Sequence, residues 1–222
     1  MNTPTPFVPT AEAAFIAGIS DRDMNRVVDE HILPDTLLLL RDGRLFSRLA
    51  AAFARFYFGT EKVFVADFRR QVVTELTTRL ATRSDRYFVL ALPEAMPKDL
   101  NWNIDRDHAQ IDVAVFVQEA WTRVRQVERA SSLVTTAPDV LAGEAVFAGT
   151  RVPIEIIVSS LEKGIDKRRL VSSYPFLTDA HIDAAHVFSR IHPKRGRPRR
   201  IADVHPEWTP KSSRLVRAAA KA

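Results

Sequence analysis

Two short helical segments meet at a glycine near the N-terminus, and their spacing restricts the folds open to the chain. Thr10 is placed to cap a helix that ends before Gly18. Ser20 or Asp21 is placed to cap a second helix that runs to about residue 33. Glycine permits a tight turn, and small or apolar residues stand where the two helices must pack: Ala14, Met24 and Val27.

A β-hairpin is predicted next. Residues 37–40 and 45–46 are apolar, and the Asp42-Gly43 pair between them favours a tight type I′ turn. Apolar residues then recur at helical spacing from residue 47 to residue 58. We therefore expect residues 1–58 to form a winged helix-turn-helix DNA-binding domain in which the hairpin is the wing.

The second helix is expected to present polar side chains to DNA. Arg and Asn can make paired hydrogen bonds to base edges in the major groove, which predicts base contacts from Arg22, Asn25 and Arg26. Three further arginines are expected to hold phosphates: Arg41, Arg44 and Arg48. Acidic neighbours repel phosphate and oppose this reading: Asp21, Asp23, Asp29 and Glu30. A plain helical hairpin with solvated charges, or a module that binds protein instead of DNA, stays open.

The middle region, residues 59–133, mixes helical and strand patterns. We expect helices at 67–82 and 118–131, strands at 87–92 and 111–117, and a loop at 93–107. Residues 134–192 predict a small helical domain: a hairpin within 143–153, a helix from Pro153 to Gly164, a short helix capped by Asp166, and a last helix capped by Thr178. The fold class expected is α+β and mostly helical, with a three-helix module behind the hairpin.

Positive charge is concentrated at the C-terminal end. The chain has a net charge of +5, yet residues 194–222 hold nine Lys or Arg against Asp203 and Glu207, a net +7, which leaves −2 on the remainder. With several prolines and few apolar residues, residues 193–222 are expected to be a flexible basic tail. Such asymmetry predicts a polyanionic or acidic partner, although a tail that only aids solubility is the alternative.

The tail supports two kinds of contact. Its Arg-Gly-Arg-Pro string is the core of an AT-hook, which lies in a narrow minor groove. Alternatively, its guanidinium groups can pair with carboxylates in the catalytic pocket of another protein. The downstream Trp208 offers an apolar anchor that favours a protein partner. The arginines concerned are Arg195, Arg197, Arg199 and Arg200.

Composition argues against several other classes. The chain has no Cys, which excludes disulfides and thiolate chemistry, and no apolar run approaches the roughly 20 residues of a membrane span. The N-terminus lacks a secretory pattern, so we expect a cytoplasmic protein. No enzymatic motif is found, and we expect no cofactor. A polar loop could hold a cation but is more simply solvated: Asp105, Asp107, His108 and Asp112.

The Gly149-Thr150-Arg151-Val152-Pro153 string, the helix-ending Gly164 and the Tyr174-Pro175-Phe176-Leu177-Thr178 junction together resemble the small helical domain of VapB-type antitoxins. The two ends of the chain resemble the larger antitoxins of this group. Ala142, where the family often has glycine, departs from the pattern. The resemblance implies a PIN-domain ribonuclease toxin as partner and binding to operator DNA.

These observations predict a non-enzymatic antitoxin that neutralises a PIN-type ribonuclease and represses its own operon. A palindromic operator requires a two-fold dimer, and we expect a homodimer whose contacts come from residues 59–133 and the hairpin at 143–153. The alternative is a stand-alone transcription regulator whose tail is a minor-groove hook. A metal-dependent nuclease is a third, weaker reading.

Overall fold

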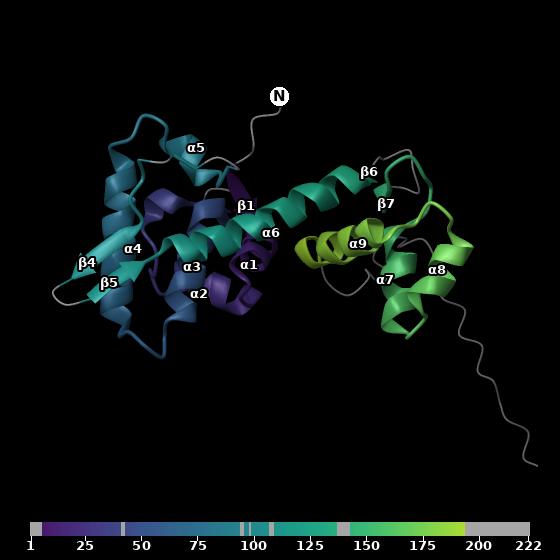
Figure 1. The fold of residues 1–222 in the computed structure, drawn as a ribbon, viewed down its shortest axis with the longest axis horizontal. Coiled ribbons are helices and arrows are strands. Elements are labelled where there is room, and N and C mark those ends of the chain that lie inside the picture. The colour runs from purple at the N-terminus through teal and green to yellow at the C-terminus, as the bar shows by residue number, and fades with distance from the viewer. Residues whose placement is uncertain are drawn as a thin grey trace, which may run out of the picture.

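Helices make up most of the computed structural model, and the strands form small sheets (Figure 1). The structure describes residues 6–40, 43–93, 96–97, 99–106, 109–136 and 143–193. This mixed helix and strand content agrees with the expected class. Among the described residues, no helix is both long enough and apolar enough to cross a bilayer.

The N-terminal part is built on a three-stranded antiparallel sheet in the order β1-β3-β2. Helices α1 and α2 come between the first two strands in sequence, and a 3-10 turn precedes the second strand. The elements are β1 (Phe7–Pro9), α1 (Thr10–Ala17), α2 (Asp21–Asp29), η1 (Asp35–Leu37), β2 (Leu38–Leu39) and β3 (Leu45–Ser47). The hairpin of β2 and β3 agrees with the sequence, whereas β1 was not expected.

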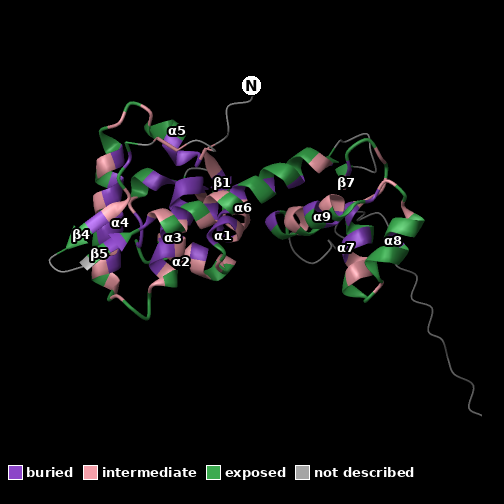
Figure 2. Cartoon of the chain, viewed as in Figure 1, coloured by how far each residue is buried: buried purple, intermediate pink, exposed green. Residues whose placement is uncertain are grey.

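Helix α3 (Arg48–Gly59) lies at the centre of this part and packs against α1, α4 (Ala66–Ala81) and α6 (Ala114–Leu133). Its alanines at 50–52 and 54 and its Phe53 and Phe56 have no exposed surface. A helix that is apolar on nearly all sides must be covered on all sides. Figure 2 shows buried residues in this region, where α1, α3 and α6 meet.

The middle region differs from the predicted order of elements. The strand expected at 87–92 is a short helix, α5 (Arg86–Leu90), because Val89 and Leu90 reach the core while Tyr87 and Phe88 stay exposed, as on a helix. The expected loop at 93–107 contains β4 (Asn103–Arg106), which pairs with β5 (Ala109–Asp112). The strand expected at 111–117 stops at 112, since the Asp112 carboxylate accepts a hydrogen bond from the Ala114 N–H and starts α6 there.

Helix α6 extends from the first group of helices to the C-terminal group (Figure 1). Val117, Val124 and Val127 of this helix belong to one hydrophobic cluster. Ala130, nearer its C-terminal end, belongs to a second cluster. Helix α9 (Asp179–Ile191) packs along α6 and also contacts α1. The two clusters therefore share two helices.

The C-terminal group contains β6 (Val134–Thr136), β7 (Ala145–Phe147), α7 (Ile154–Glu162), α8 (Lys167–Ser173) and α9. Strand β7 pairs with β6, and the hairpin expected within 143–153 is reduced to a single bridge between Val146 and Pro153. The expected helix starts are confirmed. Asp166 accepts from the Arg168 N–H, and Thr178 forms a capping box with His181.

Candidate nucleic-acid interface

The turn between α1 and α2 has the predicted geometry. Gly18 adopts a left-handed conformation, with φ of +63°, and its N–H donates to the Phe15 carbonyl at 3.0 Å. The Ser20 hydroxyl accepts from the Asp23 N–H at 3.0 Å and caps α2. Ala14, Met24 and Val27 are fully buried, so the close packing of the two helices expected from their spacing is present.

Helix α2 presents a face of mixed charge. Arg22 is exposed, and no hydrogen bond or ion pair joins it to another described residue. Arg26 donates to Glu30 at 2.7 Å and to Asp23 at 3.1 Å, and its guanidinium lies 5.3 Å from the centre of the Phe58 ring. The hydrogen bond from Arg26 lowers the pKa of Glu30, and the Ser20 hydroxyl together with Arg26 lowers the pKa of Asp23.

The hairpin joins this face through Arg44. Its guanidinium makes a two-pronged ion pair with Asp29, at 2.7 and 3.2 Å, and also donates to the side-chain oxygen of Asn25 at 3.3 Å. Asn25 and Arg44 thus lie together, and Arg22 and Arg26 are placed on either side of Asn25 along α2. That this surface contacts DNA stays a prediction. The predicted contact Arg41 lies outside the described residues.

Arg48 is placed differently from the expectation. It is 8% exposed, pairs with Glu128 at 2.7 Å, and lies 3.6 Å from Glu12. The guanidinium thus pairs with a largely buried carboxylate of α1 and with an exposed carboxylate of α6. This burial argues against the expected phosphate contact and gives Arg48 a structural role.

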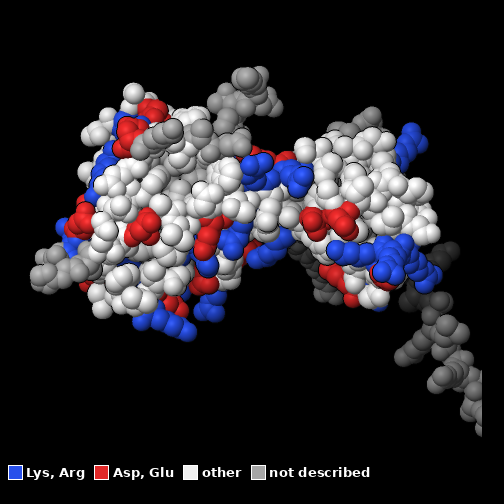
Figure 3. Space-filling model, in the orientation of Figure 1, with Lys and Arg blue, Asp and Glu red and all other residues white. Residues whose placement is uncertain are grey.

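Residues far along the chain complete the surface around α2, and sequence patterns gave no signal for them. Arg190 of α9 pairs with Asp21 at 3.3 Å. The Arg123 guanidinium of α6 lies beside the α1–α2 turn, 2.6 Å from where a Cβ on Gly18 would stand. Around α2, four arginines (Arg22, Arg26, Arg44 and Arg190) thus lie near four acidic residues (Asp21, Asp23, Asp29 and Glu30), and Arg123 adds a fifth basic group beside the turn. Figure 3 shows both signs interspersed over this part of the visible face.

A second basic surface lies at the junction of α7 and α8. Four exposed side chains occur within seven positions there, and among the described residues none of them has a carboxylate partner: Lys163, Lys167, Arg168 and Arg169. Basic side chains are visible over this corner in Figure 3. The sequence signal was the Lys-Arg-Arg run after Asp166. The tail residues predicted to bind a toxin or DNA lie outside the described residues: Arg195, Arg197, Arg199, Arg200 and Trp208.

No group of three or more His, Asp or Glu within the described part of the chain is placed to hold a metal ion. Asp105 and Asp112 lie on the paired strands β4 and β5, and Asp105 accepts from the Gln110 side chain at 3.0 Å. Asp107 and His108 of the same predicted loop lie outside the described residues.

Comparisons with known proteins identify relatives whose activity is not described. Residues 134–189 match the family described as "Protein of unknown function (DUF433)". The chain is 31% identical over 194 residues to the "Uncharacterized protein y4eO" of Sinorhizobium fredii, which covers 87% of this chain and 85% of the relative. No solved structure matches the chain.

Proposed function

Since the chain belongs to the family of y4eO and carries a DUF433 domain at residues 134–189, we propose a function for that family from this member: an antitoxin of the VapB type. In this proposal the protein is cytoplasmic, binds a PIN-domain ribonuclease encoded beside it, and represses its own operon as a homodimer. The observation that supports the DNA-binding part of this proposal is the surface formed by α2 and the β2–β3 hairpin.

The arrangement of α1, Gly18, α2 and the hairpin supports a winged helix-turn-helix. Its α2 would enter the major groove, with Arg22, Asn25 and Arg26 at base edges and the hairpin against the backbone. Arg48 is not part of this proposal because it is buried. The hairpin contributes Arg44 and, in the proposal, Arg41.

The ion pairs on this surface are compatible with DNA binding. Side chains of Arg44 and Asp29 are 40% and 54% exposed, and those of Arg26 and Glu30 are 42% and 43% exposed. Exposed pairs of this kind are worth about 0.2–1 kcal/mol, so a phosphate can replace the carboxylate at small cost. The acidic partners would then favour release from non-specific DNA, where no base contact compensates their repulsion.

The toxin-binding part of the proposal is supported by the positive charge of the C-terminal residues. A net +7 over residues 194–222, next to a remainder of −2, is suited to a pocket of carboxylates such as the one that holds Mg²⁺ in a PIN nuclease. Arg195, Arg197, Arg199 and Arg200 would enter that pocket, with Trp208 as an apolar anchor outside it. The basic corner at α7–α8 gives the folded module a second surface for an acidic partner.

The toxin-binding proposal is tested with the product of the adjacent reading frame. We expect the full chain to co-purify with that protein and to inhibit its RNA cleavage in the presence of Mg²⁺. Deletion of residues 194–222 should abolish the inhibition. If the deletion variant still inhibits, the tail is not the inhibitory element. If the neighbouring product neither binds nor cleaves RNA, the antitoxin proposal fails.

DNA binding is tested separately, on the fragment upstream of the chain's own reading frame. We expect Arg22→Ala with Arg26→Ala to weaken binding at least tenfold, while Arg168→Ala on α8, which removes another exposed arginine, changes it little. Equal losses from the two sets of variants would contradict recognition by α2.

The second candidate is a stand-alone transcription regulator. It is favoured by the Arg195-Gly196-Arg197-Pro198 string, which suits a narrow minor groove. Under this reading, deletion of residues 194–222 abolishes operator binding, whereas Arg22→Ala with Arg26→Ala does not. The same DNA titrations therefore separate the two candidates.

A further inference from the structure

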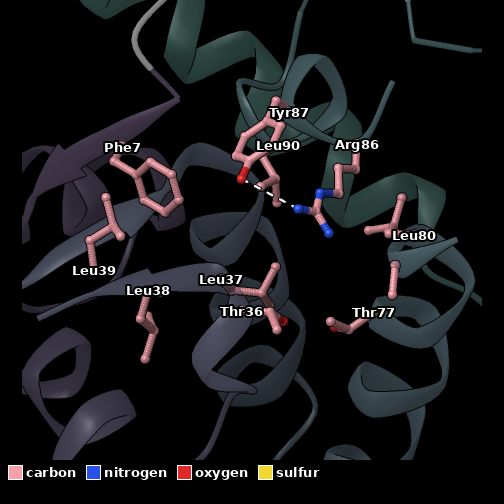
Figure 4. Close-up of a pocket in the computed structure, with 11 residues that line it drawn as sticks. Phe7, Thr36, Leu37, Leu38, Leu39, Thr77, Leu80, Arg86, Tyr87 and Leu90 are labelled. Atoms are coloured by element: carbon pink, nitrogen blue, oxygen red, sulfur yellow. Dashed lines mark hydrogen bonds between the residues drawn. The ribbon is translucent and has the colours of Figure 1, made fainter. Parts of the chain in front are cut away.

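A pocket of about 410 Å³ lies away from the α2 surface, between the N-terminal sheet and helices α4 and α5 (Figure 4). Strand β2 and η1 form one side, the last turns of α4 form the opposite side, and α5 closes the third. Pockets of about 300–1,000 Å³ are the size that holds small organic molecules in proteins. Its volume therefore admits a ligand.

The pocket wall is mostly apolar. Phe7, Leu37, Leu80 and Leu90 line it, each from a different element. Leu37 and Leu90 belong to the hydrophobic core, whereas Leu39 and Tyr87, at 41% and 60% exposed, stand at the surface. A ligand with an apolar body would contact the four wall residues and would cover part of the exposed pair.

One charged group faces this apolar wall. The Arg86 guanidinium lies among the lining residues, with Tyr87 and Leu90 on one side and Leu37 and Thr77 on the other (Figure 4). It lies 4.9 Å from the centre of the Tyr87 ring and donates to the Tyr87 hydroxyl at 3.4 Å. Among the described residues, no carboxylate lies within ion-pair distance of Arg86. The neighbouring Asp85 pairs with Arg83 instead, at 2.7 Å.

From this combination we propose that the pocket binds a small amphipathic anion, with an apolar body against α4 and β2 and a carboxylate or similar group on Arg86. A guanidinium pairs with a carboxylate in a fixed two-pronged geometry, which gives such a ligand its orientation. The Tyr87 hydroxyl is a second donor at the same end of the pocket. A neutral molecule of the same shape lacks the ionic contact and is not preferred.

The proposal is tested on the full chain with octanoate and 1-octanol, which share an eight-carbon body and differ in the charged head. Binding is followed by ligand-observed NMR and by titration calorimetry. We expect octanoate to bind more tightly than 1-octanol. Arg86→Gln should weaken octanoate about tenfold and leave 1-octanol unchanged, and Arg86→Lys should retain the preference for the anion. Arg129→Gln, which removes an exposed arginine of α6, should change neither.

A second variant places a large side chain in the pocket. Ala81 is an exposed residue of the wall, so Ala81→Trp should fill the space without disturbing the core and should abolish binding of both molecules. Circular dichroism and thermal melting establish that each variant is folded. Equal affinity for the two molecules, unchanged octanoate binding in Arg86→Gln, or no binding of either at millimolar concentration would overturn the proposal. So would the finding, by analytical ultracentrifugation, that Ala81→Trp breaks a dimer, because the pocket would then be a contact between two copies.

Discussion

Arg48 shows how one side chain can be diverted from a surface role to a structural one. It begins α3 directly after the hairpin, where a phosphate contact was expected, yet it is 8% exposed and lies between Glu12 and Glu128. A charge this well covered must be neutralised within the fold. Arg44, four positions earlier, is 40% exposed and pairs at the surface.

We predict that Arg48→Met lowers the free energy of unfolding by about 3 kcal/mol, because it leaves Glu12 buried without its main cation. Arg44→Met serves as the matched control and should cost less than about 1 kcal/mol, since its pair with Asp29 is exposed. Urea denaturation measures both values. Similar costs for the two variants would contradict the structural assignment of Arg48.

The largely buried Glu12 carboxyl should make the free energy of unfolding depend on pH in a definite direction. Burial raises the pKa of this carboxyl from its usual 4.5, and Arg48 only partly opposes the shift. Between 4.5 and the raised value the folded state binds more protons than the unfolded state, so this group makes stability fall as pH rises. Glu12→Gln has no such contribution. The difference in unfolding free energy, Glu12→Gln minus wild type, should therefore grow from pH 4 to pH 7; a flat difference would contradict the shift.

Asp29 is predicted to restrain DNA binding. It holds Arg44 at 2.7 Å and adds negative charge beside the proposed base contacts. Asp29→Asn should therefore raise affinity for the upstream DNA by about fivefold, or roughly 1 kcal/mol. Asp183→Asn, an exposed change of the same charge on α9, is the control and should have a smaller effect. Fluorescence anisotropy with labelled DNA measures both, and a weaker complex with Asp29→Asn would contradict the prediction.

The turn between α1 and α2 depends on glycine for two reasons. Gly18 has φ of +63°, and a Cβ there would lie 2.6 Å from the Arg123 guanidinium. We predict that Gly18→Ala costs about 1–2 kcal/mol for the backbone conformation and, in addition, displaces Arg123. Gly164→Ala is the control, because its φ is +81° and its Cβ would meet nothing within 4 Å. Thermal or urea melts compare the two, and a smaller cost at Gly18 than at Gly164 would show that Arg123 does not press on the turn.

Helix boundaries were predictable where a local group defines them. Ser20, Asp166 and Thr178 each accept a backbone hydrogen bond at a helix start, and that signal depends only on the next few residues. Thr10 was expected to cap α1 but is its first residue, after Pro9. The strand predicted at 87–92 was wrong. β-Branched and aromatic residues favour strands only weakly, and the burial of Val89 and Leu90 beside α3 outweighs that preference.

The molecule as a whole is held together by two shared helices. Helix α6 places Val124 in the first hydrophobic cluster and Ala130 in the second, and Val187 of α9 packs against both. We therefore predict cooperative unfolding: amide hydrogens in α3 and α9 should exchange with opening free energies that agree within about 1 kcal/mol. Hydrogen exchange followed by mass spectrometry measures this. Much faster opening of α9 alone would show that the C-terminal group unfolds independently.

Much of the local structure follows from short stretches of sequence: the glycine turn after α1, the hairpin around Gly43, and the capped starts of α2, α8 and α9. Each depends mainly on backbone conformation or on hydrogen bonds between neighbours, which the adjacent residues largely determine. Long-range contacts decided the rest. Pairing of β1 with β3, burial of Arg48, the Arg190–Asp21 pair and the pocket around Arg86 all join residues distant in sequence, and no periodicity or composition specifies which distant residues meet.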